Sequence, residues 1–189
     1  MLVQCAWLEP REEPLPVYLP EELINPLQGW LDAVFLPSSL IGFRLLFCPW
    51  LANESVSVAD GVTVTPFPTT HLEGLKQIID PRADDRFKVY GLIIETDGRR
   101  VVVSSDLGSP QDLDGALREP CDVLVCELSH YTPDELFVFL RDRKIGQLVL
   151  THLAPALAGQ EEQLVAAARA ALPGVGRIVV PRDGDEVTF

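Results

Sequence analysis

The sequence is poor in the residues that metal-binding and disulfide-rich proteins usually carry. It contains only three histidines, four cysteines and one methionine in 189 residues. Cys5, Cys48, Cys121 and Cys126 are widely spaced and form no Cys-x-x-Cys pair, which excludes a zinc ribbon and a thioredoxin-like motif. We therefore expect four reduced cysteines with structural roles, and we expect Cys126 to point into a core.

Long apolar runs and positive charge are also lacking. Pro37, Pro49 and scattered charges interrupt the most apolar region, so no segment has the length of a membrane span. No basic stretch precedes the apolar residues of the N-terminus, so a secretory signal is not indicated, and we expect a cytoplasmic protein. The net charge of −13 argues against binding to bulk nucleic acid, because such binding needs a cationic surface. A small phosphorylated or ester substrate remains compatible with this charge.

The order of patterns indicates one α/β domain spanning residues 1–189. Alternating apolar residues predict antiparallel strands first, and helices and strands alternate after Asp106, which predicts a mixed sheet with flanking helices. We expect strands at 15–19, 43–47, 55–58, 62–67, 89–96, 100–104, 123–127, 147–151 and 177–180. We expect helices at the N-terminus and at 20–34, before 79, and at 110–117, 133–141 and 161–172, with a last hairpin turning at 183–184.

Four side chains that can bind metals come just after apolar strands. His71, Asp106, His130 and His152 each follow such a strand, and the carboxyl edge of a sheet is where α/β proteins assemble their sites. Each also has a structural interpretation: a histidine can be a hydrogen-bonded surface residue, Asp106 can cap the next turn, and Glu127 can be a solvated strand end. Singly, none of them decides the function.

Taken in order, these segments resemble the later motifs of the metallo-β-lactamase superfamily, especially its ribonuclease Z-like phosphodiesterase branch. The motifs are Thr-His71, Ser-Ser-Asp106-Leu-Gly, Glu127-Leu-Ser-His130 and Leu-Thr-His152. The resemblance covers essentially the whole chain and is strongest from residue 61 to residue 155. It implies an αββα-sandwich fold of the α/β class and metal-dependent hydrolysis of phosphodiester or related ester bonds.

The resemblance also implies roles for individual residues. His71 would bind a first metal ion, His152 a second, and Asp106 would bridge the two; zinc suits such imidazole and carboxylate ligands. His130 would donate a proton to the leaving oxygen, and Glu127 would orient His130. Asp106, Glu127 and His130 are thus the expected catalytic residues.

One motif of the superfamily, His-x-His-x-Asp-His, is absent, since no histidine precedes His71. We expect Met1 to be an internal methionine of a longer parent, with loss of the front half from the lineage as the alternative. Three ligands shared by two ions predict weak or no binding of two zinc ions by this chain. We also expect apolar sheet faces at 43–47 and 62–64 to be exposed, which would favour homo-oligomers.

Two other functions remain open. The chain could be a non-catalytic binding or assembly module that keeps only the C-terminal half of the fold. It could also be an α/β protein that does not descend from a metal-binding protein. That interpretation requires all four motifs to match the superfamily by chance. The metal hypothesis requires that His71, Asp106 and His152 converge on one point.

Overall fold

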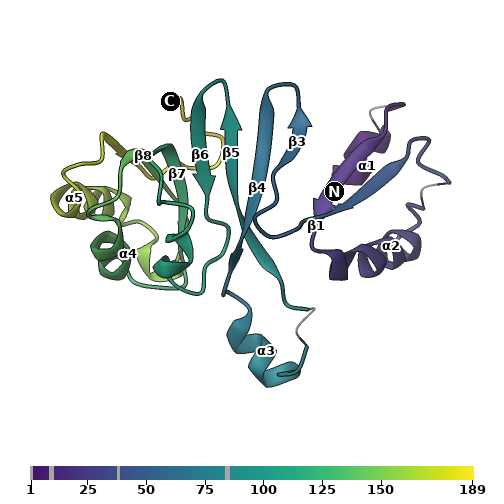
Figure 1. The fold of residues 1–189 in the computed structure, drawn as a ribbon, viewed down its shortest axis with the longest axis horizontal. Helices are drawn as coiled ribbons and strands as arrows, with labels where there is room; N and C mark the ends of the chain where they lie inside the picture. The colour runs from purple at the N-terminus through teal and green to yellow at the C-terminus, as the bar shows by residue number, and fades with distance from the viewer. Residues whose placement is uncertain (1, 9–10, 38, 84–85) are drawn as a thin grey trace. The chain divides into compact units, whose positions relative to one another are not determined.

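The computed structural model describes residues 2–8, 11–37, 39–83 and 86–189, and the chain divides into two compact units, Met1–Leu51 and Ala52–Phe189 (Figure 1). The organisation of residues 1–189 as one domain stays a prediction. Within the described ranges, no helix is both long enough and apolar enough to span a bilayer.

The first unit is built around a pair of parallel strands. Its elements are α1 (Leu2–Leu8), β1 (Leu15–Leu19), the short 3-10 helix η1 (Glu21–Leu23), α2 (Ile24–Ala33) and β2 (Leu45–Pro49). β1 pairs with β2 over their full lengths, and the Tyr18 and Trp50 rings stack with centroids 4.7 Å apart. Phe43 lies before β2, not in it, and is buried, whereas Arg44 is exposed and Leu45 to Phe47 are half-buried, so the segment is only partly exposed.

The second unit contains a seven-stranded mixed sheet, which confirms the predicted α/β class. Its strands lie in chain order, antiparallel from β3 to β6 and parallel from β6 to β9. They are β3 (Val56–Ala59), β4 (Val62–Thr69), β5 (Val89–Thr96), β6 (Arg99–Val103), β7 (Cys121–Leu128), β8 (Ile145–Leu153) and β9 (Arg177–Val179). The remaining helices are α3 (Glu73–Ile79), η2 (Pro110–Leu113), α4 (Pro133–Leu140), η3 (Pro155–Leu157) and α5 (Glu161–Ala171).

The strand directions determine where the functional residues go. β4 and β6 both run antiparallel to β5, so they point the same way, and β7 and β8 run parallel to β6. The carboxyl ends of these four strands therefore meet at one edge of the sheet. This edge receives the four loops or strand ends that carry the predicted site.

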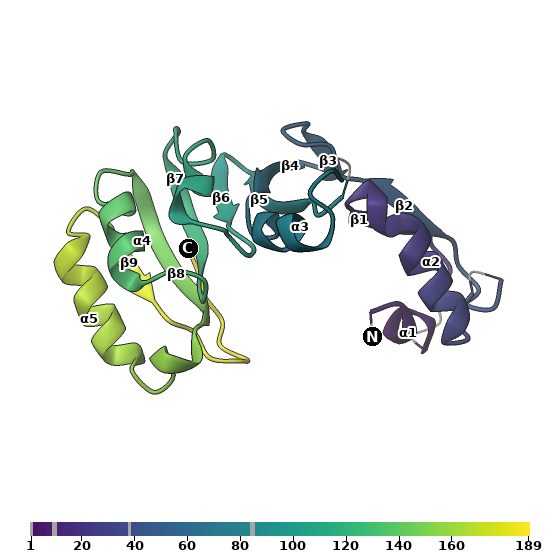
Figure 2. The ribbon, with the colours of Figure 1, turned by 90° about the horizontal axis from the view of Figure 1, so that it is seen from below.

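α4 and α5 cover one face of the parallel strands (Figures 1 and 2). α4 starts at a capping box in which the Thr132 hydroxyl and the Glu135 carboxylate satisfy each other's backbone N–H groups. The side chains that fill the space between helices and sheet are almost completely buried, including those of Leu124, Leu136, Leu140, Leu148, Leu150, Leu164 and Ala168. This close-packed core holds the parallel strands β6 to β9 in fixed positions, and with them the sheet edge at their carboxyl ends.

Three expectations for the second unit are wrong. The helix expected at 110–117 is only the 3-10 turn η2, because Gly115 and Pro120 leave too short a stretch for stable α-helical bonding. At 183–184 there is a turn, closed by the Asp185 N–H bond to the Arg182 carbonyl, but the described residues after β9 form no strand. Val64 is buried, so the face expected to be exposed at 62–64 is covered. Self-association stays a prediction.

The four cysteines are free, as expected, and Cys126 is fully buried. Burial raises the pKa of the Cys121 thiol to about 11 and that of Cys126 to about 12, whereas Cys5 is exposed.

Iodoacetamide at about pH 8 should label Cys5 long before Cys121 and Cys126. The thiolate is the form that reacts, and a raised pKa keeps the two buried thiols protonated. Peptide mass spectrometry checks this order, and rapid native labelling of Cys126 would contradict the packing of β7. Urea should make all four react.

Candidate metal centre

Four strands deliver the predicted site residues to the shared edge of the sheet. His71 follows β4, Asp106 follows β6, His130 follows β7, and His152 lies near the end of β8. All three histidines of the sequence are therefore placed together, although they come from three different strands. Such a gathering requires the whole sheet, because the residues are far apart in the sequence.

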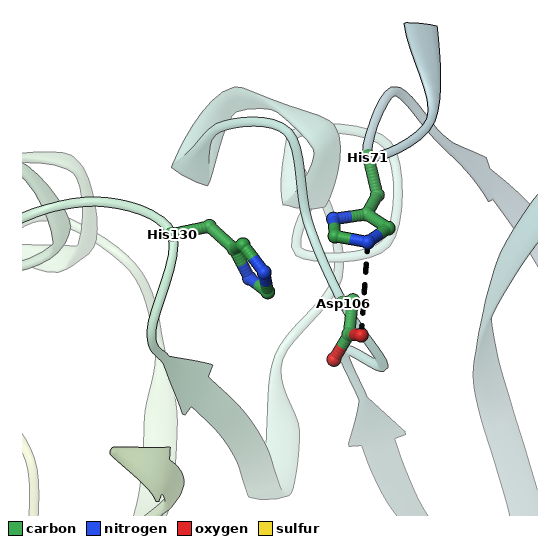
Figure 3. A group of neighbouring side chains, drawn as sticks. All are labelled: His71, Asp106 and His130. Carbon is green, nitrogen blue, oxygen red and sulfur yellow. Dashed lines mark ion pairs between the residues drawn. The ribbon is translucent and has the colours of Figure 1, made fainter. Parts of the chain in front are cut away.

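Asp106 lies between two imidazoles. Its Oδ2 is 3.8 Å from Nε2 of His71, and its Oδ1 is 3.0 Å from Nδ1 of His152. His130 completes the group, with its ring centroid 4.4 Å from that of His71 and 5.5 Å from that of His152. Figure 3 shows the His71 and His130 side chains turned toward the Asp106 carboxylate. The structure thus brings His71, Asp106 and His152 together.

The donors fit a bound metal ion. One ligand atom from each of His71, Asp106 and His130 lies within 4.8 Å of the other two, and the same is true of Glu127, His130 and His152. The 3.8 Å between His71 and Asp106 is too long for a hydrogen bond, but it is near the separation of about 3.3 Å between two ligands of tetrahedral zinc. Imidazole and carboxylate ligands of this kind suit zinc and related transition metals.

A β-bulge presents His152 to the site. In the ladder between β7 and β8, Glu127 pairs with Thr151 and Leu128 pairs with Leu153, so His152 is the extra residue without a partner on β7. Its φ of 46° lies in the left-handed region, as does the φ of 53° at Ser105 beside Asp106. Non-glycine residues adopt this region at an energetic cost, and such strain clusters at functional sites. A bulge can redirect a side chain at a strand end, and here it directs His152 toward Asp106.

Glu127 is a buried carboxylate whose described contacts are all with other residues of the chain. Its side chain is 3% exposed, and it accepts hydrogen bonds from the Leu107 N–H at 3.1 Å and the Ser129 N–H at 2.5 Å. The same carboxylate lies 3.0 Å from Nδ1 of His130. Because a carboxylate accepts, Nδ1 of His130 is assigned as the protonated nitrogen, which leaves Nε2 available at the edge. Glu127 therefore orients His130 and joins it to the loop after Asp106.

Sequence reasoning missed the residues that support this site. Asp112 was expected only as part of a helix, yet it accepts bonds from Thr70, which precedes His71, and from Gly108, two residues after Asp106. The Ser104 hydroxyl accepts a bond from the Glu127 N–H at 3.0 Å. The available signal for Asp112 was the stretch between Pro110 and Gly115, which is too short for a helix and is typical of a turn.

Glu127→Ala should destabilise the second unit because it leaves the Leu107 and Ser129 N–H groups without their acceptor. We expect a loss of about 1–3 kcal/mol in the free energy of unfolding, measured by urea and circular dichroism. The matched control is Glu95→Ala, whose side chain is 53% exposed and lies 3.9 Å from Arg100, and it should change stability by about 0.5 kcal/mol at most. Equal stability of the two variants would contradict this account of Glu127.

Comparisons with known proteins agree with this architecture. The model of the family described as "Beta-lactamase superfamily domain" matches residues 3–176. The chain is 16% identical to Zn(2+)-bound PqqB from Methylobacterium extorquens, over 88% of this chain and 60% of that one, with a TM-score of 0.58. It is 15% identical to an isothiocyanate hydrolase from Delia radicum gut bacteria, over 93% of this chain and 67% of that one, with a TM-score of 0.60. No curated protein matches the sequence.

A third similar structure is a diphosphatase of the PhnP family, with 17% identity over 90% of this chain and a TM-score of 0.56. The chain spans 60% of the PqqB chain and 56% of the diphosphatase chain, so it corresponds to less than two thirds of either. Identities this low show the shared fold alone. The family match spans most of the chain, however, and with the mixed sheet and its flanking helices it establishes that the chain belongs to the beta-lactamase superfamily, with the metallo-β-lactamase fold.

Proposed function

We propose that this chain carries the centre of a metal-dependent hydrolase that cleaves phosphodiester or related ester bonds. The observation that supports this most is the convergence of His71 and His152 on the two oxygens of Asp106. The similar structures include a zinc-bound protein, an isothiocyanate hydrolase and a diphosphatase, which are compatible with hydrolysis at such a centre.

His71, Asp106 and His152 are the proposed ligands, and zinc is the proposed metal. Each oxygen of Asp106 faces a different histidine, which supports a bridging role for this carboxylate between two ions. When bound, zinc would supply positive charge that polarises the scissile group and lowers the pKa of water. The side chains of Asp106 and His152 are 42% and 53% exposed, so a small substrate can reach the ligands from solvent.

His130 and Glu127 are the proposed proton-transfer pair. The bond from Nδ1 of His130 to the buried Glu127 carboxylate fixes the orientation of the ring. A protonated His130 can give the proton on Nε2 to the leaving oxygen of an ester. Glu127 does not need to leave its hydrogen bonds for this, so it acts by holding the imidazole.

Metal binding by this chain alone should be weak. Three proposed protein ligands would serve two ions, whereas a closed zinc site normally has four donors for one. All three histidines of the sequence are already at the centre, so the chain offers no further imidazole. We therefore expect little or no turnover from the isolated chain at zinc concentrations that do not saturate these ligands.

Zinc titration followed by calorimetry tests the ligand set. His71→Ala, Asp106→Ala and His152→Ala should each lower the zinc affinity by at least about tenfold, because each removes a direct ligand. Asp114→Ala is the control, since Asp114 is an exposed carboxylate paired with Arg143 at 2.6 Å. Wild-type affinity in all three variants would overturn the proposed site, and tight binding of two zinc ions would overturn the expectation of weak binding.

Hydrolysis of bis(4-nitrophenyl) phosphate and 4-nitrophenyl acetate at saturating zinc tests the reaction. Where the wild type turns over, His130→Ala should lower kcat by about 10²–10⁴-fold, the usual contribution of a general acid. The rates are compared at a zinc concentration that saturates both proteins, because His130 is also one of the donors that lie close enough to hold an ion. A chain that binds zinc and cleaves neither ester would favour the alternative, a non-catalytic binding or assembly module.

A further inference from the structure

His71 and Asp106 come from loops that the sheet itself does not bring together. β4, which precedes His71, and β6, which precedes Asp106, are separated by β5. Two strand spacings of about 4.8 Å place β4 and β6 roughly 10 Å apart. Beyond the end of the sheet the two loops come closer together than this, because contacts at this edge bring the Thr70 and Gly108 N–H groups to one and the same acceptor oxygen.

The Asp112 side chain makes these contacts. Its Oδ2 accepts the Thr70 N–H and the Gly108 N–H, each at 2.9 Å, and its Oδ1 accepts the Thr70 hydroxyl at 3.0 Å. Thr70 directly precedes His71, and Gly108 follows Asp106 by one intervening residue. One carboxylate thus binds the backbones of both ligand-bearing loops.

The two loops are packed against each other without spare room. A Cβ atom on Gly108 would lie 2.2 Å from the Thr70 hydroxyl oxygen and 2.7 Å from the Thr70 carbonyl carbon. The Thr69 hydroxyl also donates to the Asp106 carbonyl at 2.8 Å. Only glycine at 108 permits this approach, which lets a single acceptor reach donors on both sides.

Asp112 is itself held in place by the core. It lies in η2, where Pro110 is buried and Leu113 is fully buried on either side of it. Leu113 belongs to the same apolar cluster as Leu124 and Leu136. The acceptor is therefore fixed to the parallel half of the sheet, so the His71 loop is fixed to it as well.

We propose that Asp112 is the positioning residue of the metal centre, which holds the His71 loop at coordinating distance from Asp106. This rests on the proposed function, because it assigns Asp112 a role toward the same ligands. Asp112 does not bind the ion in this account, since its oxygens are already occupied by three donors. Its carboxylate acts through the backbone on both sides of the centre.

These contacts require a hydrogen-bond acceptor at position 112 more than they require the negative charge of a carboxylate. In Asp112→Asn, the amide oxygen can still accept both backbone N–H groups, and the amide nitrogen can donate to the Thr70 hydroxyl. Asp112→Ala removes every one of these bonds. The asparagine variant should therefore rescue what the alanine variant loses, which a purely electrostatic role of Asp112 would not allow.

Cobalt(II) titration followed by visible absorption tests the role at the metal centre. Asp112→Ala should lower cobalt affinity by about tenfold to a hundredfold and change the ligand-field bands, as loss of supporting bonds around metal ligands typically does. Asp112→Asn should keep the wild-type bands, and its affinity should lie close to the wild-type value. Asp114→Ala, on the same loop but paired with Arg143, should leave both unchanged.

Amide hydrogen exchange of the metal-free chain supplies a second, independent measurement. Asp112→Ala should accelerate exchange at the Thr70 and Gly108 amides by at least about tenfold, whereas Asp112→Asn and Asp114→Ala should not. Should Asp112→Ala fail to fold, Thr70→Val, which removes one of the three bonds, should show a smaller change in the same direction.

The outcomes separate this proposal from the proposed function. Absence of cobalt binding in the wild type would count against the metal centre, and the exchange data would then decide the role of Asp112 alone. Wild-type exchange in Asp112→Ala, or equal cobalt affinity in Asp112→Ala and Asp114→Ala, would overturn the role of Asp112.

Discussion

The Asp106 carboxylate is the contact on which the rest of the site depends. Its two oxygens face His71 and His152, which come from strands on opposite sides of β6. The end of β6 lies midway in the strand order between the ends of β4 and β8, from which these two histidines come. The change from antiparallel to parallel pairing also occurs at β6, so Asp106 lies where the hairpin half of the sheet meets the helix-covered half. The centre therefore depends on the correct assembly of both halves.

The supporting contacts divide between the two sides of Asp106. Glu127 links His130 to the loop after Asp106, and Asp112 links that loop to Thr70 and hence to His71. Both acceptors are attached to the buried cluster under α4, Glu127 through β7 and Asp112 through η2. The proposed ligands thus rest on a set of hydrogen bonds, and apolar packing fixes the residues that accept these bonds. A site built in this way can be open to solvent and still keep its geometry.

The sequence predicted which strands would carry the site better than it predicted how the side chains meet. Periodic apolar runs indicate β4 to β9, and the chain order of strands and helices indicates a mixed sheet, because these signals are local. The bulge that isolates His152 depends on contacts with another strand, so no local pattern reports it. The expected helix at 110–117 is a different case, because Gly115 and Pro120 leave room only for a short turn. The sequence could therefore indicate this turn, but it could not indicate the bonds from Asp112 to Thr70 and Gly108. The ligand roles of His71, Asp106 and His152 remain proposals.

The charge of the centre connects metal binding with substrate choice, because bound cations would change the sign of the charge that a substrate meets there. Asp106 and Glu127 bring two carboxylates to the site, and the two imidazoles proposed as ligands, His71 and His152, would bind a metal as neutral groups, in a chain of net charge −13. Such a centre attracts cations and repels a phosphodiester anion. Two divalent ions would reverse the local sign, while the acidic residues farther away are screened beyond about 8 Å at physiological ionic strength. Metal binding would therefore turn the same edge of the sheet from a cation site into an anion site. The acidity of the whole chain is then compatible with a small anionic substrate, but it still opposes a polyanion that must lie along the surface.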